Sequence, residues 1–161
     1  MRATVISFKY RRNKKLDRIL AELLWAALQG RNCFEQVDLI VPVPSHWSRR
    51  VVRGYDHVDL LAGQLAALSG KPLGRALKAA KRVRPQVGLG REARFDNVRG
   101  AFRAAGWVRA WEGSVCLVDD VTTTGATLHE AAATLARAGV DRIAAAVVAK
   151  ATIPGDRPSL V

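Results

Sequence analysis

Cysteine is scarce in this sequence. Cys33 and Cys116 are the only two, and they lie too far apart to fit the spacing of a metal-binding motif. We therefore expect neither a zinc site nor a disulfide framework. Cys116 lies within an apolar run and is expected to be a small core residue.

Long apolar segments are also missing. No run approaches the roughly 18 residues needed to span a bilayer, and the first residues lack the apolar core and cleavage site of a signal peptide. The sequence has no Walker A lysine motif, no HExxH helix and no Gly-x-Ser-x-Gly elbow. These absences predict a soluble, cytoplasmic protein with no membrane span, and they argue against kinase-like nucleotide use and hydrolase chemistry.

Positive charge is abundant. The 161 residues include 26 Lys and Arg against 14 Asp and Glu, which gives a formal net charge of +12. Such a balance favours an anionic partner, which could be nucleic acid, a phosphorylated metabolite or an acidic protein. An Arg-rich but merely solvated surface is the alternative. Many of the cations fall within residues 49–53 and 71–103, outside any terminal tail.

Apolar periodicity predicts an α/β fold with a mostly parallel sheet flanked by helices. Helical spacing occurs at residues 14–29, 58–70 and 128–138, with glycines at or after the ends. Strands are expected at residues 37–43, 73–77, 114–118 and 142–148, and residues 100–105 are expected to re-enter the sheet. Residues 78–99 show no clear period and are interpreted as a loop, and residues 152–161 as a loose tail.

One segment, residues 115–127, combines features of a ligand site. A buried strand is expected to end in Asp119 and Asp120, and a threonine-rich loop with Gly125 then opens into a helix. Ligands bind at the carboxyl ends of parallel strands, and a helix start attracts phosphate. Paired carboxylates suit two sugar hydroxyls or a hydrated magnesium ion. The pattern predicts a ribose 5-phosphate site, whereas the alternative is that Asp119 and Thr124 only cap the helix.

The same segment resembles the signature with which type I phosphoribosyltransferases bind 5-phosphoribosyl-1-pyrophosphate (PRPP). The resemblance implies their Rossmann-like fold. It also implies that Asp119 and Asp120 hold the ribose 2- and 3-hydroxyls and are the candidate magnesium ligands. The 5-phosphate would be wrapped by Thr122, Thr123, Thr124, Gly125, Ala126 and Thr127.

More of the chain is similar to the ComF-like branch of that family. The matching motifs are Val41-Pro42-Val43-Pro44, Arg53-Gly54-Tyr55, and the blocks at residues 8–10, 86–89 and 94–102. ComF-like chains usually begin with a four-cysteine zinc module, for which this sequence has no counterpart, and Asp56-His57 replace their usual Asn-Gln. We expect one phosphoribosyltransferase-like domain over residues 1–161, shortened at its N-terminus. A truncated homologue without a stable fold is a further alternative.

Two basic stretches are candidates for binding the pyrophosphate group of PRPP and for covering the reacting centre. Pyrophosphate that leaves the ribose needs cationic donors. The candidate pyrophosphate-binding residues are Ser45, Arg49, Arg50, Arg53 and Gly54, of which the three arginines are the cations. Residues 81–99 resemble the mobile loop that covers the reacting centre in this superfamily. The candidate catalytic residues there are Arg82, Arg84, Gln86 and Arg94. Ordinary basic surface loops are the alternative for both stretches.

Two functions are compatible with these patterns. One is an enzyme that uses magnesium and transfers a phosphoribosyl group from PRPP to an unidentified nitrogen acceptor. The other is a non-catalytic module that binds PRPP, a nucleotide or single-stranded DNA and acts with the competence machinery in DNA uptake. A second copy of the chain is a further candidate partner, with which it would form a homodimer. His46, His57 and His129 show no ligand spacing and are expected to be surface or cap residues.

Overall fold

The computed structural model describes residues 14–44, 56–80 and 91–151. The elements follow the chain in the order α2 (Lys14–Leu28), α3 (Asn32–Glu35), β1 (Leu39–Pro42), α5 (His57–Ser69), β2 (Leu77–Ala79), α6 (Arg91–Val98), β3 (Phe102–Ala104), the 3-10 helix η1 (Gly106–Ala110), β4 (Val115–Thr122), α7 (Ala126–Arg137) and β5 (Ile143–Lys150). Among the described helices, none has both the length and the apolar character needed to cross a bilayer.

A three-stranded parallel sheet in the order β1-β4-β5 lies at the centre of the fold. Its middle strand, β4, begins with Val115–Val118, and all four of these residues are buried. Side chains alternate between the two faces of a strand. Cys116 and Val118 accordingly join one apolar core, and Val115 and Leu117 join the other. The parallel sheet and the core position of Cys116 confirm the sequence predictions.

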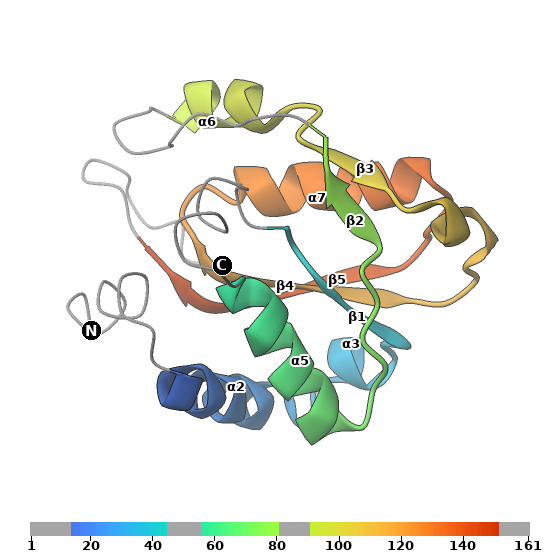
Figure 1. Ribbon diagram of the computed structural model, residues 1–161. Coiled ribbons are helices and arrows are strands. Elements are labelled where there is room, and N and C mark those ends of the chain that lie inside the picture. The colour runs from blue at the N-terminus through green and yellow to red at the C-terminus, as the bar shows by residue number, and fades with distance from the viewer. Residues whose placement is uncertain (1–13, 45–55, 81–90, 152–161) are drawn as a thin grey trace.

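Helices cover both faces of this sheet, as Figure 1 shows. On one face α2 and α5 pack together and bury Leu24, Leu61 and Leu65 against the sheet. On the other face α7 contributes Ala131 and Leu135. The predicted helices correspond to α2, α5 and α7, and Gly30, Gly70 and Gly139 follow their last turns with positive φ angles of 72°, 69° and 103°.

The second half of the expected sheet is arranged differently. Strands β2 and β3 form their own antiparallel ribbon and do not join the parallel sheet, so the prediction that residues 100–105 re-enter it is wrong. The predicted strand at residues 73–77 is also largely wrong, because Leu73 makes only an isolated parallel bridge to Ile40 and β2 begins at Leu77.

Helix α6 was not expected. It lies within residues 78–99, which the sequence suggested to be a loop, and it packs against α7 on the same side of the sheet as the β2–β3 ribbon (Figure 1). Its buried residue Val98 contacts a small core with Ala101 and Ala126, and Phe95 packs against that core. The tail predicted at residues 152–161 lies outside the described residues.

Candidate functional site

Strand β4 projects beyond β1 at its carboxyl end. The last β1–β4 pair joins Pro42 to Val118, whereas pairing with β5 continues to Thr122 and Lys150. We call residues 119–122 the β4 overhang. Its four residues extend about 13 Å past the end of β1, and they are only partly buried. The sequence placed Asp119 and Asp120 at the end of a strand; the buried part does end at Val118, but the strand itself continues to Thr122.

The two carboxylates belong to different faces of the overhang. Strand alternation places Asp119 on the α7 side with Leu117, and Asp120 on the α2–α5 side with Val118. Asp119 Oδ1 accepts a hydrogen bond from the Asp120 backbone N–H at 2.8 Å, and Asp120 Oδ1 accepts one from the Val121 N–H at 2.7 Å. The pair therefore offers two separate carboxylate ligands, one on each side of the strand.

The donor set suits a magnesium ion that arrives with a phosphorylated ligand. Magnesium in proteins is commonly held by one or two carboxylates together with substrate phosphates and water. Asp119 and Asp120 supply such oxygens. Within the described ranges no group of three or more His, Cys, Asp or Glu side chains gathers into a cage of its own.

A three-residue turn, residues 123–125, joins the overhang to α7. Gly125 is the N-cap of α7 with a φ of 79°, a left-handed conformation that strains any residue with a Cβ. Among the described residues, a Cβ at this position would meet no atom within 4 Å. The backbone angle, and not a lack of space, is therefore what favours glycine here. The Gly125 carbonyl accepts the first helical hydrogen bond, from the His129 N–H at 2.8 Å.

The N-cap position contributes no side chain to this helix start. Gly125 cannot provide one, and the Thr124 hydroxyl accepts from the Ala126 N–H at a long 3.4 Å. Asp119 lies in the strand and is not the cap, so the interpretation in which Asp119 and Thr124 only cap the helix is wrong for Asp119. The positive end of the α7 dipole therefore faces the open space beside Gly125.

Arg94 brings a cation to the same turn. Its Nη1 donates to the Thr123 hydroxyl at 2.5 Å, although the two residues are 29 positions apart. The sequence placed Arg94 on a mobile loop, but it stands in the middle of helix α6. A helix holds a guanidinium more precisely than a loop does, and a guanidinium is well suited to phosphate oxygens.

The other predicted catalytic and pyrophosphate-binding residues lie outside the described residues. They are Arg82, Arg84, Gln86, Ser45, Arg49, Arg50, Arg53 and Gly54. Of the predicted site residues that the structure describes, Arg94 contacts Thr123 directly. Asp119 lies on the same side of the sheet as α7, and Asp120 lies on the opposite side.

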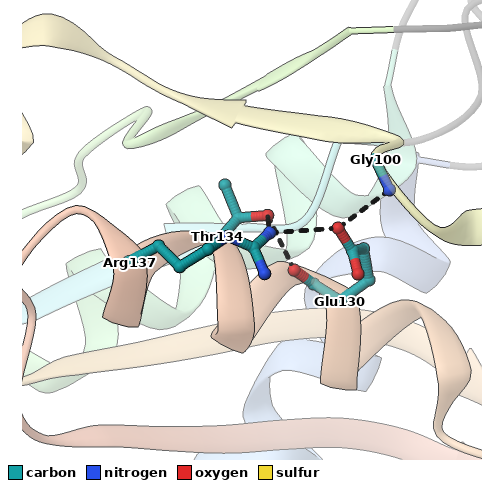
Figure 2. Close-up of polar contacts among 4 residues, drawn as sticks. All are labelled: Gly100, Glu130, Thr134 and Arg137. Carbon is teal, nitrogen blue, oxygen red and sulfur yellow. Dashed lines mark hydrogen bonds and ion pairs between the residues drawn. The ribbon is translucent and has the colours of Figure 1, made fainter.

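Sequence reasoning missed Glu130, which links α7 to α6. Its carboxylate Oε1 accepts from the Gly100 N–H at 2.9 Å and from Arg137 Nη2 at 3.2 Å, as Figure 2 shows. Thr134 donates to the Glu130 carbonyl and accepts from Arg137. The spacing of Glu130, Thr134 and Arg137 places all three on one helix face. Nothing in the sequence indicated that the Gly100 N–H would donate a hydrogen bond to Glu130.

Comparisons with known proteins identify the family. No protein-family model matches the chain. Competence protein F of Haemophilus influenzae is 37% identical over 141 residues, which cover 84% of this chain and 62% of that protein. The chain belongs to the ComF-like family. It spans about three fifths of the length of this relative.

Solved structures show which fold this ComF-like chain adopts. The glutamine PRPP amidotransferase of B. subtilis, complexed with ADP and GMP, aligns with 89% of the chain and 30% of its own length at a TM-score of 0.59 and 18% identity. A structure described as the allosteric regulatory enzyme of purine biosynthesis covers 82% of the chain and 25% of its own length at a TM-score of 0.53 and 21% identity. The ComF-like chain has the type I phosphoribosyltransferase fold.

Proposed function

We propose that this ComF-like chain binds PRPP at the carboxyl end of β4 and transfers its phosphoribosyl group to a nitrogen acceptor. The observation that carries the proposal is the start of α7 at Gly125, an N-cap without a side chain beside space left open by the described residues. The Arg94 guanidinium lies 2.5 Å from the neighbouring Thr123 hydroxyl. Such a start binds phosphate through backbone N–H groups and the helix dipole. The 5-phosphate would lie against residues 122–127.

The carboxylates would hold the sugar. Asp119 and Asp120 follow the buried part of β4, close in sequence to the turn that would bind the phosphate. Their oxygens can accept hydrogen bonds from ribose hydroxyls. Magnesium, when bound with PRPP, neutralises negative charge on the pyrophosphate, and the carboxylates are its candidate protein ligands.

The transfer breaks one bond and forms another. The bond between ribose C1 and the pyrophosphate oxygen breaks, and its electron pair leaves with pyrophosphate. The nitrogen lone pair of the acceptor forms the new bond at C1, and the nitrogen then loses a proton. Arg49, Arg50 and Arg53, with Ser45 and Gly54, are proposed to receive the pyrophosphate, and Arg82, Arg84, Gln86 and Arg94 to stabilise its developing charge.

Calorimetry tests the first half of this proposal. PRPP in magnesium buffer is expected to bind the chain with one site per molecule, and ribose without phosphate is expected not to bind. Pyrophosphate release would then be measured across a panel of amines and nucleobases. Absence of PRPP binding by folded protein would refute the proposal, whereas binding without turnover would reduce it to a non-catalytic PRPP-binding module.

A second candidate, single-stranded DNA binding in competence, is favoured by the β2–β3 ribbon. Lys78 and Arg103 are direct cross-strand partners, and both are exposed. Like charges placed opposite each other destabilise a ribbon unless an anion lies between them. Neither residue has an ion pair within the part of the chain that the structure describes.

A salt titration distinguishes the two candidates. DNA binding would weaken steeply as salt rises, and Lys78→Glu with Arg103→Glu would abolish it without changing PRPP affinity. If the double variant binds a fluorescent oligonucleotide as the unmodified chain does, the ribbon is not the DNA surface.

A further inference from the structure

We propose that Glu130 is a positioning residue that holds helix α6 against α7 and thereby keeps the Arg94 guanidinium at the turn of residues 123–125. The inference rests on the proposed function, because Arg94 matters for binding only if that turn receives a phosphate. Glu130 itself lies on the second turn of α7 and is not among the residues proposed to touch the ligand.

Helix α6 has few apolar contacts among the described residues. It is eight residues long, and its sequence is mostly polar. A helix this short is unstable in water without tertiary support. Its described apolar support consists of Val98 in the small core with Ala126 and of Phe95, whose ring meets that of His129 at 5.9 Å.

Glu130 fixes the carboxyl end of α6. Gly100, two residues past the helix, has a φ of 67°, and its N–H donates to Glu130 Oε1 at 2.9 Å (Figure 2). This hydrogen bond is charge-assisted, which makes it stronger than a neutral one. The Glu130 side chain is 13% exposed, so water competes little for the carboxylate.

The carboxylate is itself held in place. Arg137 lies about two turns after Glu130 on the same face of α7. It donates to the same Oε1 at 3.2 Å and to the Thr134 hydroxyl at 3.1 Å. Arg137 is 64% exposed, and an exposed ion pair contributes little by itself. The hydrogen bond from Gly100, more than the ion pair with Arg137, is therefore what positions α6.

Arg94 lies at the other end of this connection. It is six residues before Gly100, and its Nη1 reaches the Thr123 hydroxyl at 2.5 Å. Release of the Gly100 N–H from Glu130 would let α6 rotate or shift about the Val98 contact. A shift of about 1 Å is enough to displace a charged donor from a phosphate oxygen.

Four variants separate reach from charge. Glu130→Ala removes both, Glu130→Asp keeps the charge but withdraws the oxygen from Gly100, and Glu130→Gln keeps an acceptor within reach. Arg137→Ala removes the ion pair and the hydrogen bond to Thr134 but leaves the Glu130 side chain intact. We expect Glu130→Ala and Glu130→Asp to weaken PRPP binding about tenfold, and Glu130→Gln and Arg137→Ala to stay within about threefold of the unmodified chain.

A double-mutant cycle tests whether Glu130 acts through Arg94. Arg94→Ala alone is expected to weaken PRPP binding by roughly 10–100-fold. In that background Glu130→Ala should cause no further loss of affinity, although it still lowers Tm. Glu112→Ala, an exposed acid just before β4, is the control and should change neither measurement. Additive losses of affinity, or a loss with Glu130→Gln equal to that with Glu130→Ala, would overturn the inference.

Hydrogen exchange provides a measurement that needs no ligand. The amides of α6 and of Gly100 should exchange faster in Glu130→Ala and Glu130→Asp than in Glu130→Gln, with α5 unchanged. If the unmodified chain fails to bind PRPP, the proposed function fails, and the exchange pattern still decides whether Glu130 holds α6. Equal exchange in all three variants would refute the positioning role by itself.

Discussion

Asp17 of α2 and His57 of α5 face each other across a helix interface, with Asp17 Oδ1 3.5 Å from His57 Nδ1. Both residues are buried, at 3% and 8% exposure. Neither Asp17 oxygen has a hydrogen-bond partner among the residues that the structure describes. The prediction that His57 is a surface or cap residue is therefore wrong in its surface part, because His57 opens α5 but lies inside the protein.

The Asp17 carboxylate makes stability depend on pH in a defined direction. Burial raises its pKa, and the neighbouring His57 offsets only part of that effect. Between the ordinary carboxyl pKa of about 3.9 and the raised value, the native state binds more protons than the unfolded state. Stability contributed at this site therefore falls as pH rises through that window. The free energy of unfolding of Asp17→Asn should therefore increase relative to that of the unmodified chain as pH rises. Urea unfolding at several pH values measures this difference. A difference that is constant with pH would contradict this.

Removal of the histidine is expected to leave Asp17 uncompensated. Loss of one partner of a buried pair costs about 3–5 kcal/mol, so His57→Ala should lower Tm markedly. In an Asp17→Asn background the same substitution should cost much less, because no buried charge remains. An equal loss of Tm in both backgrounds, measured by calorimetry, would show that packing accounts for the effect.

A negative charge at the turn tests the phosphate assignment. Thr124→Asp should abolish PRPP binding, since it places a carboxylate where the 5-phosphate is proposed to lie beside Gly125. Ala110→Asp, which adds the same charge at exposed η1, is the control and should bind normally. Calorimetry measures both, and retained affinity in Thr124→Asp would refute the turn as the phosphate site.

Neutral analogues of the two carboxylates should separate binding from stability. An Asn amide oxygen can still accept from the next backbone N–H, so Asp119→Asn with Asp120→Asn should keep the overhang folded. PRPP affinity in magnesium should nevertheless fall more than about tenfold, and its magnesium dependence should disappear. A large loss of Tm with unchanged affinity would assign the pair a purely structural role.

The two thiols should differ in reactivity. Burial raises the pKa of the Cys116 thiol to about 12, whereas Cys33 is exposed. Because the thiolate is the reactive form, native protein at pH 8 should be alkylated at Cys33 alone. Mass spectrometry should find the second adduct only after denaturation. Rapid native labelling of Cys116 would contradict its core position.

Much of the parallel sheet and its helices could be predicted because their apolar patterns are strong. The β4 residues Val115–Val118 form a continuous buried run, and α2 and α7 each have a distinct apolar face. The glycines after these helices marked their ends correctly. These signals are local, and therefore a single sequence contains them.

The remaining elements depend on contacts that no local pattern encodes. Helix α6 has Phe95 and Val98 as its main apolar residues among Arg, Glu, Asp and Asn, so its period is hidden and its support comes from α7. The β2–β3 ribbon is three residues long on each side, and the choice of partner strand is a tertiary property. Arg94 was identified as a candidate, but its bond to Thr123 needed the position of α6.

The β4 overhang has an unusual consequence for hydrogen exchange. Two of its amides, those of Asp120 and Val121, donate to the carboxylates of Asp119 and Asp120. A sugar or cation that recruits those oxygens competes with these local hydrogen bonds. Ligand binding would then increase solvent exchange at two specific amides, while most bound ligands slow exchange around their sites. The hydrogen bonds at the end of the strand would therefore weaken when the ligand binds.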